Sequence, residues 1–359
     1  MLESLSLRHF TVFDDFFGDK RLKFSHLNVI VGENGTGKSH LLKLVYALTI
    51  ASHIMKDSPR QGKEEMQRVL ADKMVRVFQP DSLGRLVSRQ RGRGRCDLAA
   101  IFDQPNEYGF SFSFAGNSKT EVRLDDFPRE YLPEAPVFIP TREILSIFPG
   151  FAAALETREL AFDETYLDLA KRLALPPRKG AKPSSESGML SLLEEILGGK
   201  IHLERGRFYL LSEDSGTGKL EIPLVAEGIR KVGMLTYLLL NGSLKDRGIL
   251  IWDEPETNCH PRMMVSLAKA LVLMAQRGTQ IFLATHSLFF LRELAIIRWQ
   301  GDQSVPFRYF GLERTKEGVL VDQADSPEEL DPLGLLDEDI QQTERYFEAS
   351  GEEKNALLE

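Results

Sequence analysis

The residues of this sequence best suited to chemistry are Gly32 to Ser39, which read G-E-N-G-T-G-K-S. They follow the mostly apolar run from Leu27 to Val31 and precede a helical stretch from Ser39 to Ile50. This strand–loop–helix order is the context that a phosphate-binding loop requires. Its glycines let backbone N–H groups point at phosphate oxygens, helped by the positive end of the following helix. The sequence therefore predicts nucleoside-triphosphate binding rather than a glycine-rich turn without a ligand.

Two side chains of this loop have specific expected roles. Lys38 is expected to reach the β- and γ-phosphates, and the Ser39 hydroxyl is placed to bind Mg²⁺. The sequence contains no N-K-x-D motif for guanine, which argues against a small GTPase and leaves ATP with Mg²⁺ as the expected ligands. The expected nucleotide-binding residues of the loop are Gly32, Glu33, Asn34, Gly35, Thr36, Gly37, Lys38, Ser39 and His40.

A second acidic motif lies far along the chain, where Gly248 to Pro255 read G-I-L-I-W-D-E-P. An apolar strand that ends in two acids is the usual companion of a phosphate loop. Asp253 is expected to hold Mg²⁺, and Glu254 to orient or deprotonate the attacking water. The alternative is an acidic strand-to-helix turn in which Asp253 only caps a helix. The intact phosphate loop favours the catalytic interpretation.

His286 follows the next apolar strand, Ile281 to Ala284, after a predicted helix from Arg262 to Gln276. Strand–helix–strand units of this length have parallel strands and a right-handed connection. We therefore expect His286 and Asp253 to emerge at the same edge of the sheet, where open α/β sheets bind ligands. A histidine there can contact the γ-phosphate or the attacking water. A purely structural histidine is the alternative.

These motifs together resemble the ATP-binding-cassette superfamily, and more narrowly the SMC-like and OLD-type AAA ATPases of bacteria. The specific parts are G-E-N-G-T-G-K-S, then L-I-W-D-E-P-E-T-N-C-H-P, then A-T-H-S. The resemblance implies a head-to-tail homodimer that encloses two nucleotides. It also implies a phosphate-binding Lys38, a metal-binding Ser39 and Asp253, a catalytic base Glu254 and a switch histidine His286.

Two departures from the family pattern concern the residues that complete the site. The signature helix normally begins with serine and glycines, but here Val225 to Lys231 read V-A-E-G-I-R-K. Gly228 and the helix N-terminus can still supply N–H groups, and Arg230 or Lys231 can supply charge. The usual glutamine before the helical insertion is also absent. One residue of Thr141 to Glu143 is expected to replace it.

Composition limits the remaining choices. The 359 residues carry a net charge of -8, with 42% hydrophobic and 27% charged residues. These values suit a globular protein and do not by themselves indicate nucleic-acid or membrane binding. Cys96 and Cys259 have no metal or redox spacing. Met1 to Thr11 lacks the long apolar stretch of a signal peptide, so we expect a cytoplasmic protein without a membrane segment.

The order of predicted elements indicates an α/β fold, a phosphate-loop NTPase with an ABC/SMC-like ATPase head. Its mixed sheet is expected to carry an antiparallel β-subdomain and an inserted helical lid. Within a single domain, 1–359, we expect four regions. They are an N-terminal β-subdomain with the phosphate loop, 1–52; the inserted lid and antiparallel β region, 53–223; the signature helix and catalytic core, 224–300; and C-terminal strands with an acidic helical tail, 301–359.

Several local patterns are clear enough to test. Gly109 to Phe114 and Glu121 to Leu124 alternate apolar and polar residues, which predicts an antiparallel hairpin. Glu143 to Leu175 is expected to be mainly helical. Ser58 to Arg95 is polar and charged. Ile249 to Trp252 is apolar at every residue, as in a parallel strand covered on both faces.

A cluster of arginines stands out in this acidic protein. The segment G-R-L-V-S-R-Q-R-G-R-G-R-C suggests contact with nucleic-acid phosphates or with an acidic partner. A solvated surface loop is the alternative, and no aromatic residue is interleaved to stack on bases. The residues concerned are Arg85, Arg89, Arg91, Arg93 and Arg95.

The biological role is the least determined part of the prediction. The leading hypothesis is an ATPase that dimerises on ATP and controls a separate effector protein, in bacterial antiviral defence or a toxin-like system. This step rests on analogy of fold. The alternatives are an SMC-like clamp on DNA, or the ATPase subunit of a transporter.

Overall fold

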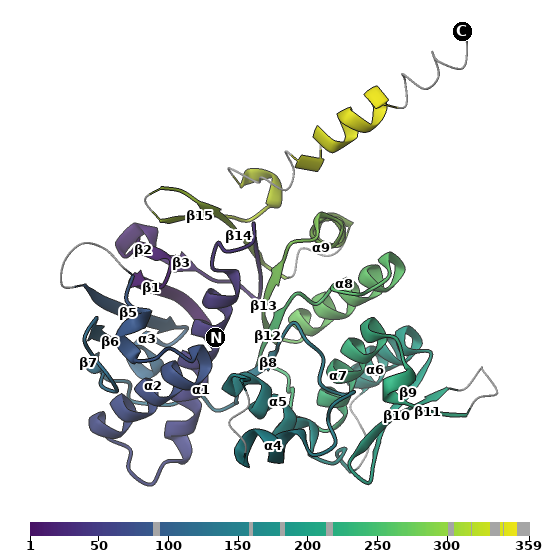
Figure 1. Ribbon diagram of the computed structural model, residues 1–359, viewed down its shortest axis with the longest axis horizontal. Helices are drawn as coiled ribbons and strands as arrows, with labels where there is room; N and C mark the ends of the chain where they lie inside the picture. The colour runs from purple at the N-terminus through teal and green to yellow at the C-terminus, as the bar shows by residue number, and fades with distance from the viewer. Residues whose placement is uncertain are drawn as a thin grey trace.

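Figure 1 shows the computed structural model of the chain, which describes residues 1–88, 94–157, 161–179, 184–212, 218–300, 305–316, 318–330, 338–339 and 341–349. Within these residues, one large mixed sheet holds twelve strands. Its strands are β1 (Leu2–Phe10), β2 (Phe13–Phe16), β3 (Leu22–Lys23), β4 (Leu27–Gly32), β5 (Arg95–Phe102), β6 (Phe110–Ala115), β7 (Arg123–Asp126), β8 (Val137–Ile139), β12 (Ile249–Asp253), β13 (Gln280–Thr285), β14 (Phe307–Arg314) and β15 (Val319–Ala324).

The remaining elements within the described residues are a small antiparallel sheet, α-helices α1 to α9, a helical segment at residues 341–349 and four short 3₁₀ turns. The small sheet consists of β9 (Gly199–Glu204), β10 (Arg207–Ser212) and β11 (Lys219–Glu221). The 3₁₀ turns are η1 (Gly18–Lys20), η2 (Leu83–Leu86), η3 (Ile222–Leu224) and η4 (Pro327–Glu329). The α-helices are α1 (Lys38–Asp57), α2 (Lys63–Phe78), α3 (Pro105–Tyr108), α4 (Phe151–Thr157), α5 (Glu164–Leu173), α6 (Ser184–Leu197), α7 (Glu227–Leu240), α8 (Pro261–Gln276) and α9 (Leu288–Gln300).

One half of the large sheet is parallel, in the order β8, β12, β13, β4 and β14, with β8 at the edge. The register pairs Asp253 of β12 with Ala284 of β13, and Thr285 with Val31 of β4. The prediction of parallel strands on either side of α8 is therefore confirmed. Because the carboxyl ends of these strands meet at one edge, that edge gathers the segments that follow them.

Helices cover both faces of this parallel sheet, which explains why its strands are apolar at almost every residue. Val29 of β4 packs into a core with α6, α7 and α8, whereas the adjacent Ile30 packs into a core with α1 and α2. Figure 1 shows α1 and α2 on one side of the sheet and α6, α7 and α8 on the other. The sheet is thus the rigid base from which the loops at its edge project.

The other half of the sheet is the antiparallel subdomain expected from the sequence. The predicted hairpin is present as β6 and β7, and β6 pairs in turn with β5. β5 pairs with β1, which the sequence pattern did not suggest. The short side chains Ala99, Ala100 and Cys96 hide the alternation of β5, although Leu98 and Phe102 are buried as in any half-buried strand.

Two predicted segments differ in detail from the structure. The polar stretch from Ser58 to Arg95 contains α2, which buries Met66, Leu70 and Met74 against α1. Residues four apart on a helix share a face, so a charged sequence can still have one apolar side. The stretch from Glu143 to Leu175 is only partly helical, because turns occupy residues 141–150 before α4 begins.

A helical lobe lies between β8 and β12 in the chain, as predicted for the inserted helical region. It comprises α4 to α7 and the small sheet, and α6 packs on both α7 and α8. The region bounds drawn from the sequence stay a prediction. Residues 341–349 form a helix that leads away from the body of the protein in Figure 1. None of the described helices combines the length and apolarity needed to cross a bilayer.

Candidate functional site

The phosphate loop joins the end of β4 to the start of α1. Gly32, Gly35 and Gly37 have φ values of 152°, 81° and 97°, in the region that side chains disfavour. A Cβ atom on Gly32 would lie 2.4 Å from the carbonyl oxygen of Leu312, and one on Gly37 would lie 2.6 Å from Val12. Glycine is therefore required at both positions by packing as well as by backbone conformation.

Lys38 begins α1 and is largely buried in the loop. Its Nζ atom donates hydrogen bonds to the carbonyl oxygens of Gly32 at 2.7 Å and of Glu33 at 2.9 Å. Burial lowers the pKa of Lys38, while the negative charges of Glu254 and Asp253 act in the opposite direction. The sequence-distant acidic motif thus lies close enough to the loop lysine to influence its charge.

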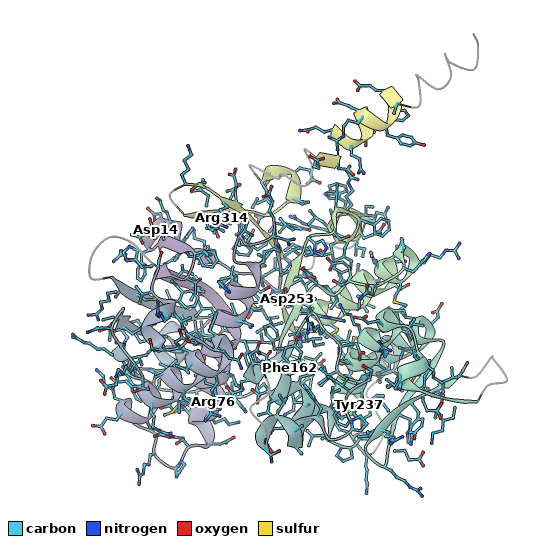
Figure 2. The ribbon with its side chains drawn as sticks, viewed as in Figure 1. Asp14, Arg76, Phe162, Tyr237, Asp253 and Arg314 are labelled. Atoms are coloured by element: carbon cyan, nitrogen blue, oxygen red, sulfur yellow. The ribbon has the colours of Figure 1, made fainter. Side chains whose placement is uncertain are left out.

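Asp253 ends β12 and faces the start of α1. The hydroxyls of Ser39 and Thr141 lie close enough to its carboxylate to lower its pKa. Burial raises the pKa of Asp253 and the charge of Glu254 adds to this, whereas the two hydroxyls and Lys38 lower it. A carboxylate beside a hydroxyl supplies the hard oxygen ligands that Mg²⁺ takes at nucleotide sites. Figure 2 marks Asp253 near the middle of the molecule, where the two halves of the chain meet.

The turn after β8 contains Thr141 to Glu143, one of which was expected to replace the glutamine of the family. Thr141 lies near Asp253, whose pKa its hydroxyl lowers. Glu143 is buried and forms an ion pair with Arg230 at 2.8 Å. Arg142 lies near Tyr166, where burial raises the pKa of Tyr166 and the charge of Arg142 lowers it. The three residues that the sequence left open therefore have different surroundings.

Glu254 and His286 meet at the carboxyl ends of β12 and β13. The Nδ1 atom of His286 lies 3.2 Å from Oε1 of Glu254, and the hydroxyl of Thr257 lies 3.2 Å from Oε2. Glu254 has a φ of 52°, which is uncommon for a residue with a side chain. The structure therefore brings the predicted base and the predicted switch histidine into direct contact.

Glu256 is a further member of this cluster that the sequence analysis did not single out. Only 3% of its surface is exposed, and its Oε1 accepts from the Thr285 hydroxyl at 2.5 Å and from the His286 N–H at 3.4 Å. Burial raises the pKa of this carboxyl, and Oε2 has no hydrogen-bond partner within the described part of the chain. The signal available in the sequence was the third acid of D-E-P-E, which is Glu256.

The signature helix α7 begins beside the acidic loop. Its N-cap residue, Ala226, makes no side-chain capping bond. A Cβ atom on Gly228 would lie 2.5 Å from the carbonyl oxygen of Asn258, so α7 and the segment after β12 are in backbone contact. Lys231 is fully buried and donates to the Glu254 carbonyl oxygen at 3.2 Å. Its ammonium therefore points towards the Glu254 peptide, and the supply of charge to a nucleotide by Lys231 stays a prediction.

His40 and Arg230, which were expected to bind nucleotide, contact other side chains in the structure. The ring of His40 packs edge-on against Phe78, and burial lowers the pKa of His40. Arg230 is held by Glu143 and by the carbonyl oxygen of Val225 at 2.9 Å. Nucleotide binding by His40, Gly228 and Arg230 stays a prediction.

Arg314 is a cation near the phosphate loop that sequence reasoning missed. It ends β14, whose register places Leu312 beside Gly32. Its terminal NH1 nitrogen lies 3.8 Å from the position of a Cβ atom on Gly35. Figure 2 labels this residue near the edge of the sheet. No local motif signals it, because only the pairing of β14 with β4 brings it to the loop.

The arginine segment is only partly within the described residues. Arg95 forms ion pairs with Asp97 at 3.3 Å and with Asp125 at 3.9 Å, so carboxylates of the antiparallel subdomain partly offset its charge. Arg85 is exposed in η2. Arg89, Arg91 and Arg93 lie outside the described residues, and phosphate contact by this segment stays a prediction.

The fold and the arrangement of these residues define a phosphate-loop protein of the ABC/SMC head class. The chain belongs to the family described as "AAA domain, putative AbiEii toxin, Type IV TA system", whose model matches residues 27–292. A comparison with curated proteins found no match.

The solved structures similar to this chain include SMC heads. An SMC head bound to the C-terminal winged-helix domain of ScpA has a TM-score of 0.55 at 12% identity, over 91% of this chain and 98% of that one. A head with an extended coiled coil bound to the ScpA C-terminal domain, derived from Pyrococcus furiosus, has a TM-score of 0.50 at 11% identity, over 94% and 98%. The SMC head domain of Thermotoga maritima gives 0.46 at 14% identity, over 90% and 98%. At sequence identities this low, the similarity shows a shared fold and nothing about function.

Proposed function

We propose that this protein binds ATP with Mg²⁺ and hydrolyses it. One observation carries the proposal: the acidic end of β12 packs beside α1, where the Ser39 hydroxyl lies close enough to the Asp253 carboxylate to lower its pKa. These residues are more than two hundred positions apart, and they belong to the two motifs that phosphate-loop enzymes use to hold a metal-bound triphosphate. Membership of an AAA family supports the same conclusion.

The proposed binding roles follow from the chemistry of each group. The N–H groups of the loop and the Lys38 ammonium bind the phosphate oxygens. Ser39 and Asp253 would hold Mg²⁺, whose charge, when it is bound, offsets that of the phosphate oxygens. Thr141 extends this oxygen-rich surface, because its hydroxyl also contacts Asp253.

Glu254 is the proposed base for hydrolysis. Its carboxylate accepts the proton of the attacking water, while His286 at 3.2 Å holds that carboxylate in one orientation. The side chain of His286 is 51% exposed, so part of the ring is open to a ligand at this edge. Glu256 fixes the His286 backbone from the buried side.

We further propose that hydrolysis takes place between two copies arranged head to tail. The start of α7 supports this, because Ala226 is exposed and the preceding Leu224 is 73% exposed. An apolar side chain next to an open helix N-terminus suits a surface that a second copy covers. Gly228 and Arg230 would then meet the nucleotide of the opposing copy.

The wider role is proposed from the family. Its description names a putative toxin of a toxin–antitoxin system, which agrees with a cytoplasmic ATPase that controls an effector protein in antiviral defence. The two SMC heads with partners are each bound to a domain of ScpA, so heads of this fold can carry a separate protein.

The test compares phosphate release from ATP by the wild type and by two variants, with and without Mg²⁺. Lys38→Ala is expected to abolish nucleotide binding, whereas Glu254→Gln keeps ATP bound and loses about 100-fold or more in kcat. Lys56→Ala is the control, because this exposed lysine lies at the far end of the same helix. Wild-type protein that releases no phosphate with MgATP contradicts the proposal.

Light scattering on Glu254→Gln tests the two-copy arrangement. With ATP this variant is expected to be a dimer, because bound nucleotide persists between the heads. A monomer at saturating ATP contradicts the head-to-tail proposal but leaves nucleotide binding intact. A steep loss of DNA affinity with salt in the presence of ATP would instead favour the DNA-clamp alternative, and co-purification with a membrane protein would favour the transporter alternative.

A further inference from the structure

Lys231 is a buried cation of α7 whose surroundings do not balance its charge by direct contact. None of its surface is exposed. In the described part of the chain, its ammonium has one hydrogen bond, to the main-chain oxygen of Glu254 at 3.2 Å. Burial lowers the pKa of Lys231, although Cys259, Glu227, Glu256 and Glu254 favour its charged form. A buried ammonium that bonds to a neutral carbonyl is unfavourable for folding.

The residue that receives this bond has an unusual backbone. The φ of Glu254 is 52°, and a left-handed conformation is unfavourable for a residue with a side chain. Its N–H donates to the carbonyl oxygen of Ala284 at 2.9 Å, and its carboxylate contacts His286 and Thr257. Lys231, which comes from a different element, therefore supplies the hydrogen bond to the carbonyl oxygen of the same residue.

A second contact of α7, made by Gly228, restricts the movement of Lys231 relative to Glu254. Gly228 and Lys231 are three residues apart and so share one face of the helix. Gly228 touches the Asn258 backbone, where a Cβ atom would come within 2.5 Å of the carbonyl oxygen. The first turns of α7 are thus pressed against the segment from Glu254 to Cys259, with the Lys231 ammonium extended to its beginning.

We propose that Lys231 is a positioning residue for hydrolysis, which holds the Glu254 peptide so that its carboxylate stays against His286. The inference rests on the proposed ATPase function. It also links the signature helix to the general base: a force on the exposed start of α7, as a second copy would exert, reaches the Glu254 carbonyl through Lys231.

This role predicts opposite effects on stability and on turnover. Methionine has a similar length and volume but no charge, so Lys231→Met removes the unfavourable burial of an ammonium. The variant is expected to have an unchanged or higher Tm. Its kcat is expected to fall at least tenfold while KM stays within threefold, because the nucleotide contacts are intact and only the base is misplaced. A merely structural lysine would give a lower Tm without this split.

Lys73→Met is the matched control. Lys73 is also buried, on α2, but it pairs with the Glu164 carboxylate at 2.8 Å. Its replacement leaves the largely buried Glu164 carboxylate with only the 4.0 Å ion pair to Arg76, so Tm is expected to fall while kcat and KM of the folded protein stay near the wild-type values. The two variants therefore separate a positioning lysine from a structural one.

A crystal structure of Lys231→Met tests the geometry without relying on turnover. The Glu254 peptide is expected to relax to negative φ and to leave His286. If φ stays near 52° and the contact persists, the inference is overturned, as it is by wild-type kcat or by a lower Tm with proportionate loss of activity. Inactivity of the wild type itself would count against the proposed function, while the relaxed peptide would still support the positioning role.

Discussion

The Nδ1 atom of His286 lies 3.2 Å from the Oε1 atom of Glu254, at the ends of two adjacent parallel strands. The distance is that of a hydrogen bond, so the two side chains have one shared orientation. Glu256 holds the backbone of His286 from behind. We propose that Glu254 as base and His286 as its orienting group act as a unit.

The first prediction concerns this coupling. His286→Ala and Glu254→Gln are each expected to lower kcat by about 100-fold, since proton transfer needs a positioned base. The double variant is expected to be no slower than Glu254→Gln, because the histidine acts through the glutamate. The measurement is steady-state phosphate release. Losses that multiply in the double variant would show that the two residues act independently.

The second prediction concerns the contact between α7 and the acidic loop. Gly228→Ala is expected to lower the free energy of unfolding by about 1–3 kcal/mol, because its Cβ atom would lie 2.5 Å from a backbone oxygen that cannot move cheaply. Gly233→Ala in the same helix is the control, since its Cβ atom would lie 3.3 Å from the flexible Leu145 side chain. Denaturant unfolding of both variants checks this. Equal stability of the two contradicts the proposed close contact.

The third prediction concerns the missing serine of the signature helix. Ala226 is the N-cap residue of α7 and makes no capping bond, so Ala226→Ser can bond a free N–H of the first turn. This change is expected to stabilise the protein by about 0.5–1 kcal/mol. Ala226→Val provides no cap and is the control. Thermal unfolding gives the comparison, and an unchanged Tm in the serine variant would contradict the assignment of Ala226 as N-cap.

The fourth prediction uses the buried carboxyl of Glu256. Burial raises its pKa above the ordinary 4.5, so the folded protein holds this proton more tightly than the unfolded chain does. The resulting stabilisation is complete below the unfolded pKa and is lost as pH rises through the folded pKa. Glutamine keeps an oxygen for Thr285 and never ionises. Glu256→Gln is therefore expected to raise Tm at pH 7.5.

The gain in Tm of Glu256→Gln is expected to shrink as the pH approaches 4.5, where the carboxyl of the folded wild type is protonated. The measurement is Tm of both proteins across this pH range. Thr285→Val removes the hydroxyl that bonds to Glu256 and serves as a reference for the loss of that contact. A Tm difference that does not depend on pH would mean that Glu256 titrates normally.

Local sequence predicted the parts of the site that short segments define. The glycines of the phosphate loop, the acidic end of β12 and the apolar parallel strands all follow from residue type and spacing over a few positions. The pairing of β12 with β13 also followed, because right-handed strand–helix–strand connections leave little choice.

Side chains whose role depends on distant partners could not be assigned in this way. The sequence analysis named Thr141 and Lys231 only as alternatives and missed Arg314, and each reaches the site because a separate element packs beside β4 or β12. The apolar face of α2 was likewise hidden in a charged segment until its packing on α1 was visible.

The sequence by itself determined that a phosphate loop and an acidic strand end exist, because backbone conformation and periodicity are local properties. The tertiary structure decided that Asp253 lies beside Ser39 and that a buried lysine of α7 donates a hydrogen bond to the carbonyl oxygen of Glu254. The first contact joins segments more than two hundred residues apart and the second joins two separate elements, and only the packing of helices on both faces of the sheet fixes their distances.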